Sequence, residues 1–420
     1  MNSRERVATA MNHKQPDKVP IDIGACNTTG ISVSALYRLR DYYGLPRKDM
    51  PISEIMQMLG EVDDDIRRKL GGDVIGLNNP SNIVGVPLQG EMKLFHMPDG
   101  TPALVNKLNV FDITEEGEIF LYPQGNRNAK PSCRMPSGGY FFDIVDRAPE
   151  FDEDNLTPEE DFKDHFSLYS DEDARYLEEE ATKLYTETEY SVMGVFGLGG
   201  LGDSAAYPGP AELNPKGIRS FADWNMAYYL YPDYCHTVFE MHTQNCLDNL
   251  EIYKQAVGDK IQSIVISGTD FGSQNAPLIS VDTFREFYKP YFKRMNDWVH
   301  ENTQWKTFYH SCGAVAEFLD DFIDMGVDLL NPVQLSAAGM DMHMLKEKYG
   351  DKIVFWGGGI DTQDMLPNGS PEQIKEQVKE RLNVMARNGG FVFNTVHNIV
   401  GNVKPGNIAA AFEAAQEYQY

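Results

Sequence analysis

The sequence contains no run of about 20 apolar residues, the length that an α-helix needs to cross a bilayer. Its first 20 residues carry charges and no apolar core, so we expect no secretory signal there. Only five cysteines occur in 420 residues, and they are widely spaced. An odd number of dispersed cysteines disfavours a disulfide framework, so we expect a reducing, cytoplasmic location.

Basic residues are also scarce. The 37 lysines and arginines face 63 aspartates and glutamates, which gives a net charge of −26 at pH 7. A protein that binds a nucleic acid duplex or an anionic membrane surface needs a basic footprint. We therefore expect neither nucleic acid nor a membrane as a partner.

Three common active-site patterns are not found in the places where they would indicate function. No GxGxxG turn follows the first predicted strand at 18–24, which disfavours a dinucleotide-binding fold. The glycine-rich loop at 197–202 is not followed by Lys-Ser or Lys-Thr, so we interpret it as a mobile loop and not as a phosphate cradle. No Ser-His-Asp arrangement emerges from the spacing.

From residue 190 onward, short apolar runs alternate with amphipathic segments, which is typical of βα units and a parallel sheet. With two earlier runs the strand count is about eight, which predicts an α/β fold of the closed (β/α)₈ TIM-barrel type. The predicted strands cover 18–24, 73–77, 191–196, 261–267, 305–310, 328–331, 353–357 and 390–394. The predicted helices cover 3–11, 31–47, 52–70, 219–226, 232–257, 283–302, 314–325, 340–349, 371–387 and 405–417.

The segment between the second and third predicted strands has a different character. Short alternating runs broken by Gly and Pro between about 81 and 147 predict antiparallel strands. The dense acidic run at 150–180 is typical of a solvated linker and helix face. We interpret residues 81–190 as a β-rich and acidic insertion within a single barrel domain that spans residues 1–420.

In a parallel barrel the chemistry lies at the carboxyl ends of the strands. His310 and Cys312 follow one such strand, and alternate residues of an extended segment face the same side. Imidazole and thiolate are preferred zinc ligands. The same pattern would also suit a core cysteine beside a hydrogen-bonded histidine.

Four further polar residues follow predicted strands. Asp270 could act as a general base or orient a substrate, and its alternative role is to cap a turn. Asn331 and Gln334 suit substrate binding or loop hydrogen bonding. His397 follows the last strand, which barrel closure places beside the first, so it is a candidate third ligand or a loop histidine.

Five segments stand out, namely RERVATAMNHKQPDKVPIDIG at 4–24, GTDFGSQNAPLIS at 268–280, YHSCGAV at 309–315, VDLLNPVQ at 327–334 and WGGGIDTQ at 356–363. They resemble the uroporphyrinogen decarboxylase superfamily, and the resemblance covers most of the chain outside 81–190. The decarboxylase branch carries a basic motif of the type Arg-Gln-Ala-Gly-Arg, whereas this sequence has Asp-Ile-Gly-Ala-Cys-Asn at 22–27. The sequence therefore resembles the branch of corrinoid-dependent methyltransferases more closely.

The resemblance implies a zinc enzyme that moves a methyl group between a small methylated substrate, for example a methoxyaromatic compound, and the cobalamin of a partner corrinoid protein. Thiol-methylating members bind zinc through His-x-Cys and a later Cys. His310 and Cys312 match the first two positions, and His397 occupies the third. The implied catalytic residues are Asp270 and His310, and the implied ligands are His310, Cys312 and His397.

Several alternatives stay open. Ether-cleaving members have an acid-x14-acid-x20-His pattern, which Asp361, Glu376 and His397 fit, so the two acids could replace His310 and Cys312. A divergent tetrapyrrole decarboxylase and a non-catalytic small-molecule-binding barrel are the competing functions. The methyl donor and the direction of transfer are open, and a homodimer is one option for the assembly.

Overall fold

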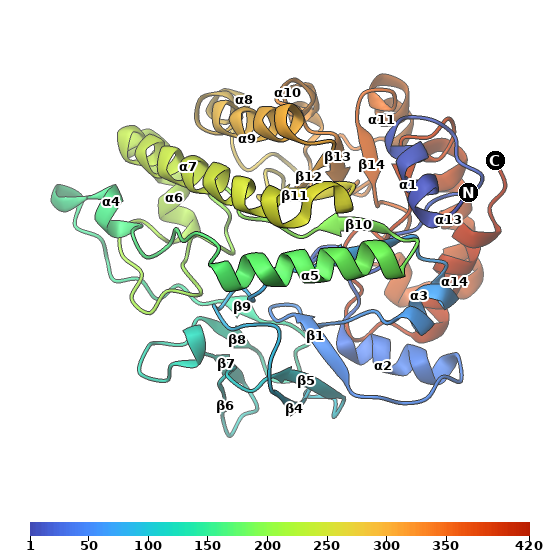
Figure 1. The fold of residues 1–420 in the computed structure, drawn as a ribbon, viewed down its shortest axis with the longest axis horizontal. Coiled ribbons are helices and arrows are strands. Elements are labelled where there is room, and N and C mark those ends of the chain that lie inside the picture. The colour runs from blue at the N-terminus through green and yellow to red at the C-terminus, as the bar shows by residue number, and fades with distance from the viewer.

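The computed structural model describes all residues 1–420, and its centre is a curled parallel sheet of seven strands (Figure 1). The strand order is β15-β14-β13-β12-β11-β10-β3, and every neighbouring pair is parallel. The strands are β3 (Val74–Leu77), β10 (Ser191–Gly194), β11 (Ser263–Ser267), β12 (Lys306–His310), β13 (Leu329–Asn331), β14 (Val354–Trp356) and β15 (Phe391–Val392).

The segment around Ile21 links the two edges of this sheet. Ile21 pairs in parallel with Phe393, next to β15, and on its other side its carbonyl accepts a 2.7 Å hydrogen bond from Asp73 N–H, next to β3. The architecture is therefore consistent with a (β/α)₈ barrel in which the eighth strand is a single bridge. The full strand predicted over 18–24 is wrong, because Pro20 has no N–H to donate and Gly24 turns the chain at a φ of 75°.

Helices pack around the outside of the sheet, and both termini lie on the same side of the molecule (Figure 1). Predicted and observed bounds agree for α7 and α14. None of the helices combines the length and the apolar character needed to cross a membrane. The main helices are α1 (Ser3–Met11), α2 (Val33–Tyr42), α3 (Asp64–Leu70), α5 (Asp171–Glu187), α6 (Phe221–Leu230), α7 (Pro232–Val257), α9 (Lys289–Asn302), α10 (Leu319–Asp324), α11 (Met342–Tyr349), α13 (Pro371–Met385) and α14 (Pro405–Glu417). The short ones are α4 (Pro158–Asp161), α8 (Val281–Thr283) and α12 (Met365–Asn368), and a π-helical turn at Phe284–Tyr288 joins α8 to α9.

The helix predicted over 52–70 is wrong in its first half. That stretch contains β1 (Met50–Glu54) and β2 (Leu59–Gly60), and only α3 is helical. The strand β1 pairs in parallel with β5 (Pro102–Asn106), about 50 residues away in sequence. The apolar residues here recur every three or four positions, which imitates a helix, and a non-local pairing overrides that local pattern.

Between β3 and β10 the chain forms antiparallel strands, as predicted for 81–147. Two of them, β4 and β5, join β1 and β2 in a sheet of order β2-β1-β5-β4, in which β1 and β5 are parallel. The other four form an antiparallel sheet of order β6-β7-β8-β9, and both sheets are drawn at the bottom of Figure 1. The additional strands are β4 (Met92–His96), β6 (Phe111–Ile113), β7 (Ile119–Leu121), β8 (Cys133–Met135) and β9 (Asp143–Ile144). The single-domain assignment, with its insertion at 81–190, stays a prediction.

These small sheets border the carboxyl end of the parallel sheet. The carbonyl of Met56, in the turn between β1 and β2, accepts a 2.6 Å hydrogen bond from Phe142 N–H. In the same turn, Gln57 Oε1 accepts a 2.8 Å bond from Asn398 Nδ2, in the loop that follows β15. The β-rich region therefore contacts a loop at the end of the sheet where the parallel strands stop.

Alternation along each parallel strand divides the core into two layers. Phe308, Leu329 and Val354 belong to an inner cluster of 13 buried residues. The residue that follows each of them, Tyr309, Leu330 and Phe355, belongs to an outer cluster of 92. Side chains two positions apart face the same side of a strand. His310 and Asn331, two residues after Phe308 and Leu329, therefore face the interior.

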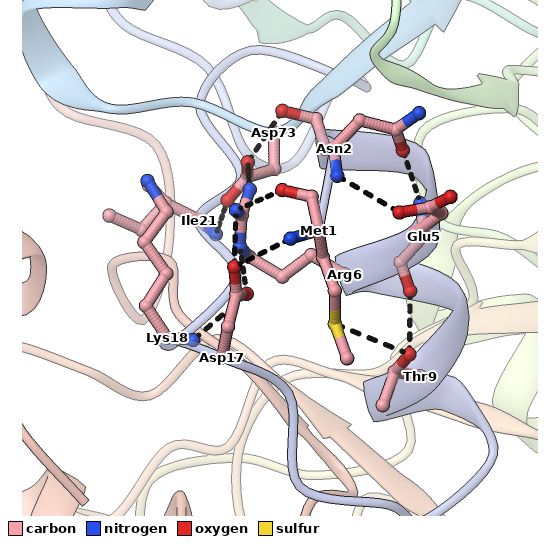
Figure 2. Close-up of polar contacts among 10 residues, drawn as sticks. Met1, Asn2, Glu5, Arg6, Thr9, Asp17, Lys18, Ile21 and Asp73 are labelled. Carbon is pink, nitrogen blue, oxygen red and sulfur yellow. Dashed lines mark hydrogen bonds and ion pairs between the residues drawn. The ribbon is translucent and has the colours of Figure 1, made fainter.

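A buried ion pair ties α1 to the closing segment and to β3 (Figure 2). Arg6 Nη1 lies 2.6 Å from Asp73 Oδ1, and the two side chains are 7% and 2% exposed. The other oxygen of Asp73 accepts a hydrogen bond from Ile21 N–H at 3.1 Å. Arg6 also contacts Asp17, with Nε 2.8 Å from Oδ1. The guanidinium thus neutralises the carboxylate that holds the bridging segment in place.

We predict that Arg6→Ala lowers the free energy of unfolding by about 3 kcal/mol, because it leaves the Asp73 charge buried without its partner. Urea denaturation followed by circular dichroism measures the change. Arg47→Ala is the control, since Arg47 pairs with Asp41 on the surface and its side chain is 67% exposed. Equal, small changes in both variants would contradict the structural role of Arg6.

Candidate metal centre

Three side chains converge at the carboxyl end of the sheet: His310 ends β12, Cys312 follows in the next turn, and His397 lies in the loop after β15. Their ligand atoms all lie within 4.8 Å of one another, and no other group of three His, Cys, Asp or Glu side chains has this geometry. Cys312 Sγ is 3.3 Å from His310 Nε2. The two imidazoles meet edge to face, with ring centroids 5.3 Å apart.

The turn after β12 directs Cys312 toward His310. Gly313 has a φ of 84°, and a Cβ at this position would lie 2.4 Å from the carbonyl carbon of Gly272. Only glycine fits this conformation and this close approach. The turn is therefore packed tightly against the loop that follows β11.

Burial sets the protonation of the three side chains. It lowers the pKa of His310 to about 4, and burial together with the neighbouring His310 ring lowers the pKa of His397 to about 4. Both imidazoles are therefore neutral at pH 7 and can offer a lone pair. Burial and the charge of Asp270 raise the pKa of the Cys312 thiol well above its ordinary value. A cation bound here would displace the thiol proton.

Asp270 borders the three side chains from the loop after β11. Its Oδ1 accepts a 2.6 Å hydrogen bond from Cys312 N–H and lies 3.8 Å from His310 Nε2. The side chain is 40% exposed. Nearby protein atoms still exclude part of the water around the carboxyl group, and this desolvation raises the pKa of Asp270. Asp270 thus contacts the ligand-bearing turn and also reaches solvent, where a substrate could meet it.

Asn331 and Gln334, which were predicted to hold substrate, form hydrogen bonds with β12 and the turn that follows it. Asn331 is fully buried; its Oδ1 lies 2.6 Å from His310 Nδ1 and its Nδ2 donates to the Trp356 carbonyl at 2.9 Å. Gln334 Oε1 accepts from Gly313 N–H at 2.9 Å. Direct contact of either side chain with substrate stays a prediction, but their polar groups already support the ligand-bearing strand and turn.

The structure does not group the alternative acidic ligands with His397. Asp361 Oδ1 accepts hydrogen bonds from Asp364 N–H and Met365 N–H at 2.7 and 3.1 Å, at the start of α12. Glu376 is exposed on α13, a helix of the outer layer. The spacing that relates these residues along the sequence therefore does not bring their side chains to one point.

The donor set of the three converging residues fits zinc. Zinc in proteins binds imidazole nitrogen at about 2.0–2.1 Å and thiolate sulfur at about 2.3 Å, so tetrahedral geometry puts the two donor atoms roughly 3.6 Å apart. The 3.3 Å between His310 Nε2 and Cys312 Sγ is close to this separation. Three protein ligands with a fourth position left open are typical of catalytic zinc.

Two residues near this centre were not predicted from the sequence. Thr28, in the turn after the bridging segment, donates to Asn331 Oδ1 at 3.3 Å. Asp203 lies just beyond the glycine-rich loop after β10; burial raises its pKa to about 6, and the charge of Asp270 adds to the effect. An acidic residue that follows a strand-end loop is a signal that could have identified Asp203.

Comparisons with known proteins point to one family. Residues 213–418 match the family model described as uroporphyrinogen decarboxylase (URO-D). The uroporphyrinogen decarboxylase of Chlorobaculum parvum is 25% identical over 211 residues, 48% of this chain and 54% of that protein. The methylated-thiol–coenzyme M methyltransferase of Methanosarcina mazei is 28% identical over 114 residues, 26% of this chain and 27% of that protein. The matches thus span about half, or less, of these curated relatives.

A solved structure described as a methyltransferase from Methanosarcina mazei is similar in fold over the whole chain. The alignment covers 99% of both chains with a TM-score of 0.56 and 16% sequence identity. At this identity the likeness shows a shared fold, which extends beyond the segment matched by the family model.

Proposed function

Residues 213–418 of this chain match the family model of uroporphyrinogen decarboxylase, and from that premise we propose that the chain is a zinc-dependent methyltransferase. It moves a methyl group from a small methylated substrate to the cobalamin of a partner corrinoid protein. The observation that carries the proposal is the convergence of His310, Cys312 and His397 at the carboxyl end of the sheet. The partial match to a methyltransferase that acts on methylated thiols is in line with it.

Decarboxylation of a tetrapyrrole fits the residues less well. A porphyrinogen that carries several carboxylates needs cationic partners, whereas the sequence has no arginine at 22–27. The carboxyl groups near the centre are those of Asp203 and Asp270, which would repel an anionic substrate. The neutral imidazoles and the thiol suit a cation instead.

Each residue of the centre would have its own role in the transfer. His310, Cys312 and His397 would hold the zinc ion, which, when bound, supplies Lewis acidity at the atom that releases the methyl group. Asp270, which is partly exposed beside His310, would orient the substrate or hold a proton. Oxygen, nitrogen and sulfur donors all remain candidates for the methylated atom, with methoxyaromatic compounds among them.

Two measurements on the purified full chain test this function. Elemental analysis should find about one zinc per chain, and the absorbance of reduced cobalamin should change when the chain is mixed with one class of methyl donor. The donor panel comprises methoxyaromatic compounds, methylamines, methanol and methyl thiols. Chelation should abolish the transfer and added zinc should restore it. Absence of zinc, together with no transfer from any donor, would refute the proposal.

A further inference from the structure

We propose that Asn331 is a positioning residue that fixes the ring of His310 and makes Nε2 the atom that faces the metal. This inference rests on the proposed metal centre and deepens it. It also gives Asn331 a role that differs from substrate binding.

The register of two neighbouring strands brings Asn331 to His310. His310 and Asn331 are directly paired residues at the carboxyl ends of β12 and β13. Both follow a residue of the inner core by two positions, so both side chains face the interior. Their polar atoms consequently meet, with His310 Nδ1 2.6 Å from Asn331 Oδ1.

The hydrogen bonds of Asn331 determine which nitrogen of His310 carries the proton. The Trp356 carbonyl, 2.9 Å away, can only accept a hydrogen bond, so the atom of Asn331 that faces it must be the donor Nδ2. The other end of the carboxamide is then Oδ1, which can only accept. His310 Nδ1 therefore carries the proton, and Nε2 of the neutral ring carries the lone pair. Nε2 is the atom that lies 3.3 Å from Cys312 Sγ.

The Asn331 carboxamide is enclosed by protein on all sides. Asn331 has no exposed surface, and Thr28 Oγ1 donates a second hydrogen bond to its Oδ1 at 3.3 Å. Gly357, at a φ of 90°, lies against the amide, and a Cβ there would come within 3.1 Å of Nδ2. Neither water nor substrate can therefore replace Asn331 as the partner of His310 Nδ1.

Cys312 is held by a different group. Its N–H donates to Asp270, and the next residue, Gly313, donates to Gln334. Loss of the Asn331 carboxamide should therefore loosen the imidazole and leave the thiol in position. This separates a positioning role from a general loss of structure, because one ligand is affected and its neighbour is not.

The test compares three variants of the full chain by zinc affinity, measured by competition with a chromophoric chelator, and by thermal melting. Asn331→Leu has a branched side chain of similar length but removes all three hydrogen bonds of the carboxamide, and we expect zinc to bind about 10–100-fold more weakly. Asn331→Asp can still accept from Nδ1 but places an oxygen against the Trp356 carbonyl. It should melt at a lower temperature and yet bind zinc at least about tenfold more tightly than Asn331→Leu.

Asn296→Leu is the matched control. Asn296 is also fully buried, donates to a carbonyl, that of Met325, at 2.9 Å, and accepts from the Tyr309 hydroxyl at 3.1 Å. It contacts none of the three ligands, so its loss should lower stability without changing zinc affinity. With cobalt(II) in place of zinc, the thiolate charge-transfer band should persist in Asn331→Leu.

Several outcomes would overturn the inference. They are zinc binding by Asn331→Leu as tight as that of the wild type, an equal loss in Asn296→Leu, or no recovery in Asn331→Asp. If Asn331→Leu does not fold, Asn331→Ala gives the same comparison without a steric clash. A wild-type chain that binds no zinc would refute the proposed function and this inference together, whereas equal affinities of wild type and variants would refute this inference alone.

Discussion

Replacing His310 by alanine should remove zinc from the protein and lower the rate of methyl transfer by about 1000-fold. Lewis-acid stabilisation contributes several kcal/mol to a transition state, and each 1.4 kcal/mol or so corresponds to about tenfold in rate. His310 contributes one of only three ligand atoms in the group, so its loss leaves a thiol and one imidazole. Zinc content by elemental analysis and initial rates at saturating donor measure the two effects. Cys312→Ala should behave in the same way.

Two control variants separate this centre from the alternatives. His300→Ala removes another strand-proximal imidazole, which pairs with Asp328 at 2.8 Å and is 37% exposed, and it should leave the zinc content unchanged. Glu376→Ala should also keep its zinc if His310 and Cys312 are ligands. Unchanged zinc in both His310→Ala and Cys312→Ala would eliminate the centre, and loss of zinc in Glu376→Ala would favour the acidic ligand set.

Helices whose ends are marked by particular residues in the local sequence could be predicted closely. The helix α7 begins at Pro232, which fits the first turn of a helix, and stops before Gly258. The helix α14 likewise begins at Pro405. The segment 52–70 could not be predicted in the same way, because β1 pairs with its neighbour β2 and also with β5, a strand about 50 residues away in sequence. Local periodicity has no information about that partner.

In the candidate site, too, some features could be predicted from the sequence and others could not. The two-residue alternation of a strand predicts that His310 and Cys312 face one side, and in the structure Cys312 lies in the turn after β12 with its ligand atom near that of His310. His397 was predicted as a possible third ligand at the end of the last strand, and its ligand atom lies within 4.8 Å of the other two. The resemblance to the uroporphyrinogen decarboxylase superfamily is confirmed for residues 213–418. The contact between Asn331 and His310 was not predictable, because it depends on the register of β12 against β13, which a single sequence does not specify.

Asp270→Asn should lower methyl transfer by about 100-fold to 10,000-fold, the range for loss of a positioned acid or base, while zinc content stays unchanged. The substitution changes the two contacts of Asp270 differently. An asparagine Oδ1 can still accept the hydrogen bond from Cys312 N–H, so the turn that carries the thiol keeps its support. The negative charge beside His310 Nε2 is lost, and with it the ability to hold a proton or attract a polar substrate.

Asp270→Ala provides the comparison that assigns the effect. It removes the acceptor for Cys312 N–H as well as the charge, so it should weaken zinc binding in addition to slowing transfer. Asp259→Asn is the control, since Asp259 is exposed just before the other end of β11. The rates are compared as kcat and KM on samples of equal zinc content. Full kcat in Asp270→Asn would restrict Asp270 to supporting the turn, and loss of zinc in that variant would show that its charge helps to hold the metal.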